Sequence, residues 1–336
     1  MVETQGKSKD GPFGGLPPLV LGGATLNTQY NDDPFSIPVV EMLKHAFEHG
    51  ITAIDTSPYY GPSETIYGQA LEQLRNEWPR ESYSICTKVG RIRLDEFDYS
   101  KENVRFSVLR SCERLKTTYL DVLYLHDIEF VEEDKIMEAL CEMKRLKDEG
   151  VVLRIGISGY PVRFLYEIAK KCRDNEQIGA LDNVLSYCNL NLQNTILEQY
   201  YDKFLQECGV GVVSNGSILS MSLLAGGETK PFHPCSDELR KRSREAAEYL
   251  ASNGVAIADL ATKYAIHKWL KRGPTVLGCS NVAEVDYALK NYNQVIQNGG
   301  DGELDARDQA LVSYVQENIF KELMNSTWES GIPGRG

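Results

Sequence analysis

The sequence of 336 residues predicts an α/β protein in which eight parallel strands close into a barrel, the (β/α)8 or TIM-barrel architecture. Short β-rich segments alternate with amphipathic helical segments along most of the chain. Several strand segments are continuous apolar runs, which is typical of a parallel sheet whose outer face is covered by helices. A count of eight strands favours a closed barrel over an open sheet.

The first half of the chain predicts four strands, each followed by a helix. Apolar, β-rich segments place the strands at residues 20–22, 51–55, 84–88 and 121–126. Helical periodicity places helices at residues 37–49, from 63 onward, at 102–116 and at 133–149. Two of these helices are directly followed by Gly50 and Gly150, the residue type preferred just past a helix end.

The second half continues the alternation. Strands are expected at residues 153–158, 183–187, 211–215 and 275–278, and helices at 162–173, 195–208, 238–253, 256–270 and 282–291. We expect residues 15–336 to form one domain that includes a C-terminal tail, and residues 1–14 to form a flexible N-terminal extension. No glycine-rich dinucleotide-binding motif follows the first strand, and no phosphate-binding loop motif occurs. The sequence therefore argues against a dinucleotide-binding fold and against a phosphate-loop fold.

Composition excludes several classes of function. Hydrophobic residues make up 42% of the chain and charged residues 25%, as in soluble globular proteins. The net charge of −12 argues against a nucleic-acid-binding surface, which requires clustered Lys and Arg. Eight cysteines without metal-binding spacing indicate reduced thiols and no metal site. No apolar segment is long enough to span a membrane and no signal peptide is recognisable, so we expect a cytoplasmic protein.

Polar residues close three of the predicted strands. Asp55, Lys88 and His126 each stand at the carboxyl end of a strand, and Tyr60 follows Asp55 by five residues in a turn-rich loop. The carboxyl ends of the strands are the face at which a parallel α/β barrel carries its chemistry. Each residue alone is more often structural, but the combination predicts a proton-transfer site.

The residue types suggest a role for each member of this site. Tyr60 is the candidate proton carrier, although a free phenol has a pKa of about 10. The ammonium group of Lys88 would lower that pKa by favouring the phenolate, and Asp55 could hold Lys88 in place. His126 offers a neutral donor or acceptor that can orient a substrate oxygen.

At this point the sequence resembles the aldo-keto reductase superfamily. Its three catalytic segments correspond to Asp55-Thr-Ser-Pro-Tyr-Tyr60-Gly, Thr87-Lys88 and Leu125-His126. Two of its cofactor segments correspond to Gly156-Ile-Ser158 and Leu223-Leu224-Ala-Gly226, and the match runs from about residue 18 to 293. The resemblance implies a TIM barrel that binds a nicotinamide cofactor without a Rossmann domain. It also implies that Tyr60 is the general acid/base, that Lys88 lowers its pKa, that Asp55 pairs with Lys88, and that His126 positions the reacting oxygen.

Flanking residues resemble one branch of the family, whose members oxidise the anomeric carbon of an aldose to a lactone with NAD. The matching segments are Lys88-Val-Gly-Arg91, His126-Asp-Ile-Glu129, Ser186-Tyr-Cys-Asn189 and, less specifically, Trp328-Glu-Ser-Gly331. The implied function is an aldose 1-dehydrogenase acting on a sugar of the D-arabinose, L-galactose or L-fucose type. Such enzymes belong to pathways toward ascorbate or its five-carbon analogue.

The resemblance also implies a set of cofactor-binding residues. They are Ser158, Ser217, Leu219, Ser280, Asn281 and Glu284. Three usual nicotinamide contacts are missing: Gly159 replaces an Asn, no Gln stands near Leu185, and Gly216 replaces a stacking aromatic residue. Residues 278–284 contain no Lys or Arg for the 2′-phosphate of NADP, and the Glu284 carboxylate would repel that phosphate. We therefore expect NAD rather than NADP.

Substrate contacts are expected from His126, Arg91, Asp127 and Trp328. Arg91, Asp127 and Glu129 could each hydrogen-bond a sugar hydroxyl, but they also fit loop-stabilising ion pairs or solvated surface charges. Trp328 could cover the sugar or anchor the tail. The loop over residues 227–236 could fold over the cofactor. Two alternatives stay open: an NADPH-dependent reductase of small aldehydes or ketones, and a non-catalytic, cofactor-binding regulatory subunit. We expect a monomer or a weak homodimer.

Overall fold

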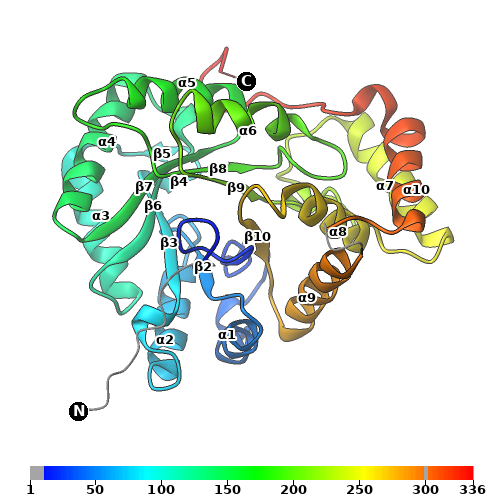
Figure 1. Cartoon of the computed structure of the whole chain (residues 1–336), viewed down its shortest axis with the longest axis horizontal. Helices are drawn as coiled ribbons and strands as arrows, with labels where there is room; N and C mark the ends of the chain where they lie inside the picture. Colours follow the sequence, from blue (N-terminus) through cyan, green and yellow to red (C-terminus); the bar gives the residue numbers. More distant parts are fainter. Residues whose placement is uncertain (1–10, 299–301, 336) are drawn as a thin grey trace.

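The computed structural model describes residues 11–298 and 302–335. Eight parallel strands form a closed barrel in the order β1-β10-β9-β8-β7-β6-β3-β2, with helices around it (Figure 1). The barrel strands are β1 (Leu19–Gly22), β2 (Ala53–Asp55), β3 (Ser84–Val89), β6 (Leu120–His126), β7 (Val152–Gly159), β8 (Asn183–Tyr187), β9 (Val212–Gly216) and β10 (Thr275–Gly278). The predicted (β/α)8 barrel is confirmed, with all eight strands in their expected places.

Helices lie against the outer face of the barrel or beside it. They are α1 (Val39–Glu48), α2 (Ser63–Leu74), α3 (Lys101–Arg114), α4 (Glu133–Asp148), α5 (Val162–Arg173), α6 (Ile196–Gln206), α7 (Asp237–Ser252), α8 (Ile257–Trp269), α9 (Val282–Gln297) and α10 (Ala306–Tyr314). A hairpin of β4 (Arg91–Arg93) and β5 (Glu96–Phe97) follows β3, and a π-helix (Val315–Phe320) continues α10. The hairpin, α10 and the π-helix were not expected from the sequence.

The amino end of the barrel is closed by the first described residues. Phe13 and Leu16 form an antiparallel bridge, and Leu16 is buried with Val20 and Tyr124 in an apolar cluster inside the barrel. Residues 11–14 therefore form a turn in a region that we expected to be flexible. The rest of that predicted extension, residues 1–10, lies outside the described residues.

A second apolar cluster lies beside the barrel. It joins α7, α8, α10 and the π-helix through residues such as Leu250, Tyr264 and Phe320. Helices α7 and α10 lie next to each other on the right of Figure 1. From there the C-terminal tail (residues 321–335) returns across the top of the view toward α5. It ends at Arg335, whose guanidinium donates hydrogen bonds to backbone carbonyls just after β6. The tail thus passes over the carboxyl ends of the barrel strands.

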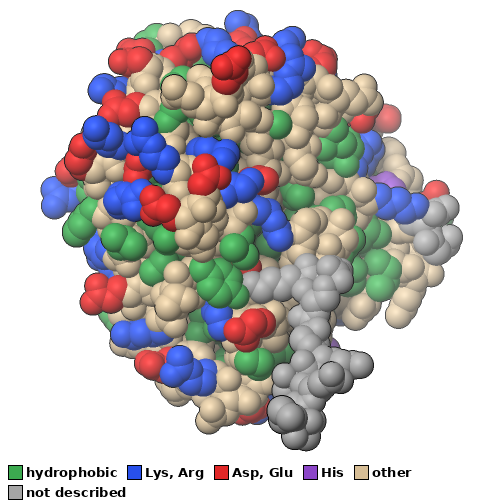
Figure 2. All heavy atoms as spheres, turned by 60° about the vertical axis from the view of Figure 1, so that its left-hand side comes forward, with side chains coloured by type: hydrophobic (Ala, Val, Ile, Leu, Met, Phe, Trp, Pro, Cys, Tyr) green, Lys and Arg blue, Asp and Glu red, His purple; other side chains and the backbone are tan. Residues whose placement is uncertain are grey.

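The outer surface is rich in ion pairs. Figure 2 shows acidic and basic side chains interspersed on the face that carries α3 and α4. Between these two helices, Arg105 bonds to Glu142 at 2.6 Å and to Glu149 at 2.7 Å. Within residues 11–298 and 302–335, no helix is both long and apolar enough to cross a bilayer.

Candidate active site

The four predicted catalytic residues meet at the carboxyl end of the barrel. Asp55 is the last residue of β2, Lys88 lies near the end of β3, and His126 is the last residue of β6. The loop after β2 brings Tyr60 to the same place: the Lys88 ammonium lies 4.7 Å from the centre of the Tyr60 ring. The rings of Tyr60 and His126 are nearly perpendicular, with their centres 5.7 Å apart. The structure thus brings together the residues that the strand ends predicted.

Lys88 and Asp55 form a buried ion pair. The Lys88 Nζ donates to Asp55 Oδ1 at 2.5 Å and to the Thr56 carbonyl at 3.0 Å. Burial lowers the pKa of Lys88, but attraction by Asp55 and Tyr60 outweighs it, and the pKa is raised above its ordinary value. Lys88 is therefore a fixed positive charge beside the Tyr60 ring.

Tyr60 keeps its proton more tightly than we expected. Burial raises the pKa of Tyr60, and the positive charge of Lys88 lowers it, with a net result above the ordinary phenol value. Lys88 thus acts in the expected direction, but the removal of water from the phenol is the larger effect. The sequence could not indicate this, because burial is set by loops and strands far apart in the chain.

His126 is a neutral imidazole, and hydrogen bonds hold both its ring and its backbone carbonyl. Burial, followed by the charges of Lys88 and Arg91, lowers its pKa well below the ordinary value. Its Nδ1 lies 3.0 Å from Ser57 Oγ, and its backbone carbonyl accepts a hydrogen bond from the Tyr99 hydroxyl at 2.5 Å. The sequence analysis missed both partners. Ser57 lies within the matched segment, so its position was visible there although its contact was not.

Arg91 and Asp127 lie beside His126. They form a buried ion pair, and Asp127 Oδ2 is 3.5 Å from His126 Nε2. The Arg91 guanidinium also stacks on the Tyr59 ring, 4.1 Å from its centre. Asp127 adopts a left-handed backbone conformation (φ 57°), which is costly for a residue other than glycine and concentrates at functional sites. The ion pair is present, and contact with a sugar stays a prediction.

Trp328 lies farther along the barrel mouth. Its ring stacks on Tyr160, with ring centres 4.3 Å apart and planes 7° apart, and it meets the edge of His233 at 5.0 Å. Tyr160 follows β7 and His233 belongs to the long loop after β9. Trp328 therefore anchors the tail between these two loops, one of the two roles that we expected. A role in covering the sugar stays a prediction.

The predicted cofactor residues lie at or just after the carboxyl ends of β7, β9 and β10, at this same face. Ser158 is buried in β7, and Ser217 and Leu219 follow β9. Ser217, Ser220, Met221 and Ser222 all have positive φ values, a run of left-handed residues that indicates a functional constraint. Contact of Ser158, Ser217 and Leu219 with a nicotinamide cofactor stays a prediction.

The last group of predicted cofactor residues forms the start of α9. Asn281 is the N-cap and its side chain accepts from the Glu284 amide, while the Glu284 carboxylate accepts from the Ser280 amide at 2.7 Å. Asn31, from the loop after β1, donates to Ser280 Oγ at 3.1 Å. Glu284 thus caps the helix and remains exposed, so it places a negative charge at this turn.

The missing asparagine has a structural explanation. A Cβ atom on Gly159 would lie 2.4 Å from Oε2 of Glu129, so the Glu129 carboxyl group fills the space that a side chain would need. At Gly216 the nearest atom to an added Cβ is 3.4 Å away, on Leu185, so that position has room. Glu129 was expected from the sequence to contact a sugar or to form a loop ion pair, and its full burial was not expected, because nothing in its spacing indicates that a loop glutamate is buried.

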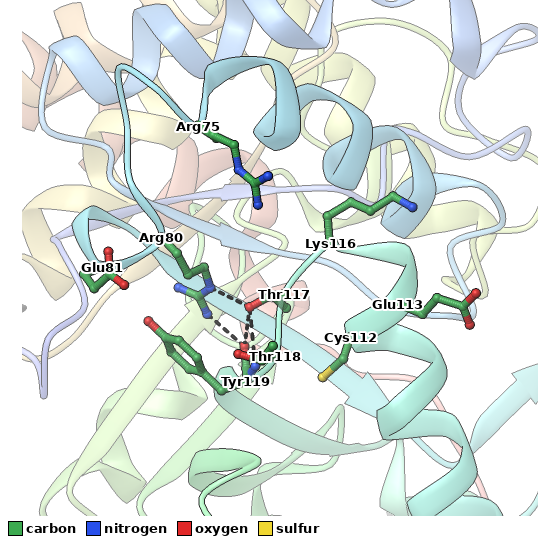
Figure 3. Close-up of a pocket in the computed structure, with 9 residues that line it drawn as sticks. All are labelled: Arg75, Arg80, Glu81, Cys112, Glu113, Lys116, Thr117, Thr118 and Tyr119. Carbon is green, nitrogen blue, oxygen red and sulfur yellow. Dashed lines mark hydrogen bonds between the residues drawn. The ribbon is translucent and has the colours of Figure 1, made fainter.

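A separate hollow lies at the opposite end of the barrel. It has a volume of about 350 Å³ and is formed by residues near the ends of α2 and α3 (Figure 3). Arg80 lines it but is already engaged by Thr117, the Tyr119 carbonyl and Asp121. The amino-terminal face of such a barrel contributes to stability, whereas catalytic residues come from the carboxyl ends of the strands, so we place the active site at the Tyr60 end.

Potential metal ligands among the described residues do not form a cluster at the site. In the part of the chain that the structure describes, no three His, Cys, Asp or Glu side chains are grouped closely enough to hold a metal ion. All eight cysteines are free thiols.

Comparisons with known proteins agree with this geometry. Residues 18–298 match the aldo/keto reductase family. The chain is 56% identical over 319 residues to D-arabinose 1-dehydrogenase of Saccharomyces cerevisiae, covering 95% of both chains. It is 36% identical over 296 residues to L-galactose dehydrogenase of Arabidopsis thaliana, covering 87% of both.

A solved structure shares the fold. The holo form of an aldo-keto reductase from Bacillus halodurans superposes with a TM-score of 0.68 at 20% identity, covering 94% of this chain and 95% of the other. Proteins of this family are oxidoreductases that bind a nicotinamide cofactor, in agreement with the Tyr60, Lys88, Asp55 and His126 arrangement. The chain belongs to the aldo/keto reductase family.

Proposed function

We propose that the protein is an NAD-dependent aldose 1-dehydrogenase, which oxidises the anomeric carbon of a sugar to a lactone. The observation that carries this proposal is the buried Lys88–Asp55 pair beside Tyr60, with a neutral His126 facing the same space. The named activities of the two relatives support an aldose of the D-arabinose or L-galactose type, and the L-fucose type rests on the sequence resemblance alone.

Tyr60, Lys88 and His126 have different roles in the proposed proton transfer. Tyr60, as the phenolate, removes the proton of the C1 hydroxyl group, and Lys88 stabilises the phenolate charge. His126 donates a hydrogen bond to the reacting oxygen. A bound nicotinamide supplies the hydride acceptor for C1. Because the pKa of Tyr60 is raised by burial, we expect the rate of oxidation to increase with pH as the phenolate forms.

The test of the activity is NADH formation with a panel of aldoses, using the wild-type protein and Tyr60→Phe. We expect turnover by the wild type, and loss of about 100-fold or more in kcat for Tyr60→Phe with NAD binding retained. No NADH formation with any sugar, together with NADPH-dependent reduction of simple aldehydes, would support the reductase alternative. Cofactor binding without turnover of either kind would support a regulatory subunit.

The preference for NAD rests on the turn that starts α9. Its one charged side chain, Glu284, is an exposed carboxylate, which would repel the 2′-phosphate of NADP. We expect Glu284→Gln, which keeps the helix cap but removes the charge, to raise activity with NADP relative to NAD. Asp286→Asn removes the same charge two residues after Glu284 and serves as the control. Equal initial rates of the wild type with NAD and NADP at matched concentrations would refute the preference.

The proposal also covers the oligomeric state and the cellular location of the protein. We expect a cytoplasmic enzyme, because its eight thiols are free, and a monomer or weak homodimer. From the resemblance of its sequence to the aldose-oxidising branch of the family, we propose that the enzyme acts in the formation of ascorbate or its five-carbon analogue. Sedimentation of the purified protein and fractionation of cells check the first two expectations.

A further inference from the structure

Ser57 lies directly against the catalytic histidine. It stands in the loop between β2 and Tyr60, and its side chain has no access to solvent. Among the described residues, its hydroxyl oxygen has two hydrogen-bonding neighbours: the Tyr59 amide at 3.1 Å and His126 Nδ1 at 3.0 Å. A serine this deeply buried must satisfy its hydroxyl group within this small set of atoms.

The hydroxyl group of Ser57 has one proton to donate and two lone pairs to accept with. The Tyr59 amide can only donate, so it occupies a lone pair. The one remaining neighbour, His126 Nδ1, is then the acceptor for the Ser57 proton. If Nδ1 carried the proton instead, the Ser57 proton would be buried without an acceptor. That arrangement is disfavoured on the order of tenfold or more.

The opposite side of the imidazole ring supports the same assignment. His126 Nε2 lies 3.5 Å from Asp127 Oδ2, and Arg91 pairs with that carboxylate. A carboxylate attracts a protonated nitrogen and repels a bare lone pair. Both neighbours of the ring therefore favour a proton on Nε2 and a bare Nδ1.

We propose that Ser57 is a positioning residue that holds the single proton of neutral His126 on Nε2. His126 then acts as a hydrogen-bond donor, and its ring is fixed by Ser57 on one side. The consequence for catalysis rests on the proposed function: Nε2 would donate to the oxygen at C1 while Tyr60 takes the proton. The tautomer itself is a property of the protein alone.

The tautomer can be read directly by ¹⁵N NMR after selective labelling of histidine. The chain has five histidines, and the signals lost in His126→Gln identify His126. In the wild type we expect a directly bonded proton on Nε2 and the shift of an unprotonated, hydrogen-bonded nitrogen for Nδ1. A proton on Nδ1 of the wild type would overturn the proposal, whether or not the enzyme oxidises sugars.

The functional arm uses Ser57→Ala. We expect kcat for aldose oxidation to fall on the order of tenfold with the KM for NAD unchanged, and the Nδ1 signal to move toward that of a free nitrogen. Ser57→Cys keeps a weak donor and should recover part of the loss.

The matched control is Ser63→Ala. Ser63 is also fully buried, and its hydroxyl group bonds to Thr56 Oγ1 at 2.8 Å and to the Gly23 carbonyl at 2.9 Å, without touching His126. It should leave kcat and the His126 signals as in the wild type. Ser57→Ala with wild-type kcat and an unmoved Nδ1 signal would remove Ser57 from this role. Absence of aldose turnover in the wild type would count against the proposed function alone.

Discussion

Glu129 provides a direct test of how burial controls charge in this barrel. It follows β6 in a short 3-10 helix and is fully buried. Its Oε1 accepts hydrogen bonds from the Tyr160 amide at 3.0 Å and from Ser330 of the tail at 3.2 Å. Its Oε2 has no hydrogen-bonding partner among the described residues. An ionised carboxylate in this setting would be poorly stabilised.

The pKa of Glu129 reflects this environment. Burial, followed by the neighbouring charge of Asp127, raises it from the ordinary value of 4.5 to about 8. The folded protein therefore binds this proton more tightly than the unfolded chain does. Its contribution to the free energy of unfolding is full below pH 4.5, decreases as the pH rises to about 8, and is then lost. At about 1.4 kcal/mol per pH unit, the decrease is about 5 kcal/mol at most.

The perturbation is Glu129→Gln, which replaces the acid by a neutral amide of the same shape. We expect urea unfolding from about pH 5 to about pH 9 to show a fall in stability for the wild type that the variant lacks, so that the variant is the more stable protein above about pH 8. Glu102→Gln, which removes an exposed carboxylate on α3, should keep the wild-type slope. Parallel curves for the wild type and Glu129→Gln would refute the reasoning.

Three further predictions concern the ion pair, the tail and helix packing. Lys88→Met leaves Asp55 as a buried unpaired carboxylate, and should lower the free energy of unfolding by about 3–5 kcal/mol in urea titrations. Adding Asp55→Asn should restore stability but not turnover; a stable single variant would contradict a buried pair. Arg335→Ala removes the hydrogen bonds that end the tail and should speed its cleavage in limited proteolysis, and an unchanged rate would argue against this anchor. Gly68→Ala would place a Cβ atom 1.9 Å from the Arg114 carbonyl oxygen. Thermal unfolding should show that the free energy of unfolding falls by about 1–3 kcal/mol. A variant as stable as the wild type would mean that α2 and α3 can move apart without loss of stability.

The strand pattern was readable because parallel strands in a barrel are buried on both faces. Segments such as residues 120–126 and 183–187 are buried along almost their whole length, so their apolar runs stand out from the helices between them. The π-helix after α10 was not readable in this way. Its apolar residues pack on α7 and α8, elements well before it in the chain, and no local pattern indicates such a contact.

In the candidate site, too, some features could be predicted from the sequence and others depend on tertiary packing. The sequence by itself determined that Asp55, Lys88 and His126 lie at or near the ends of neighbouring strands, because in a parallel barrel the chain direction brings every carboxyl strand end to one face. It also determined the family, since the order of these residues and of Tyr60 is specific. The tertiary structure decided the protonation of the site. Burial outweighs Lys88 at Tyr60, and it also raises the pKa of Glu129. The reason is physical: desolvation depends on everything that packs around a group, and those atoms come from loops and a tail far apart in the sequence.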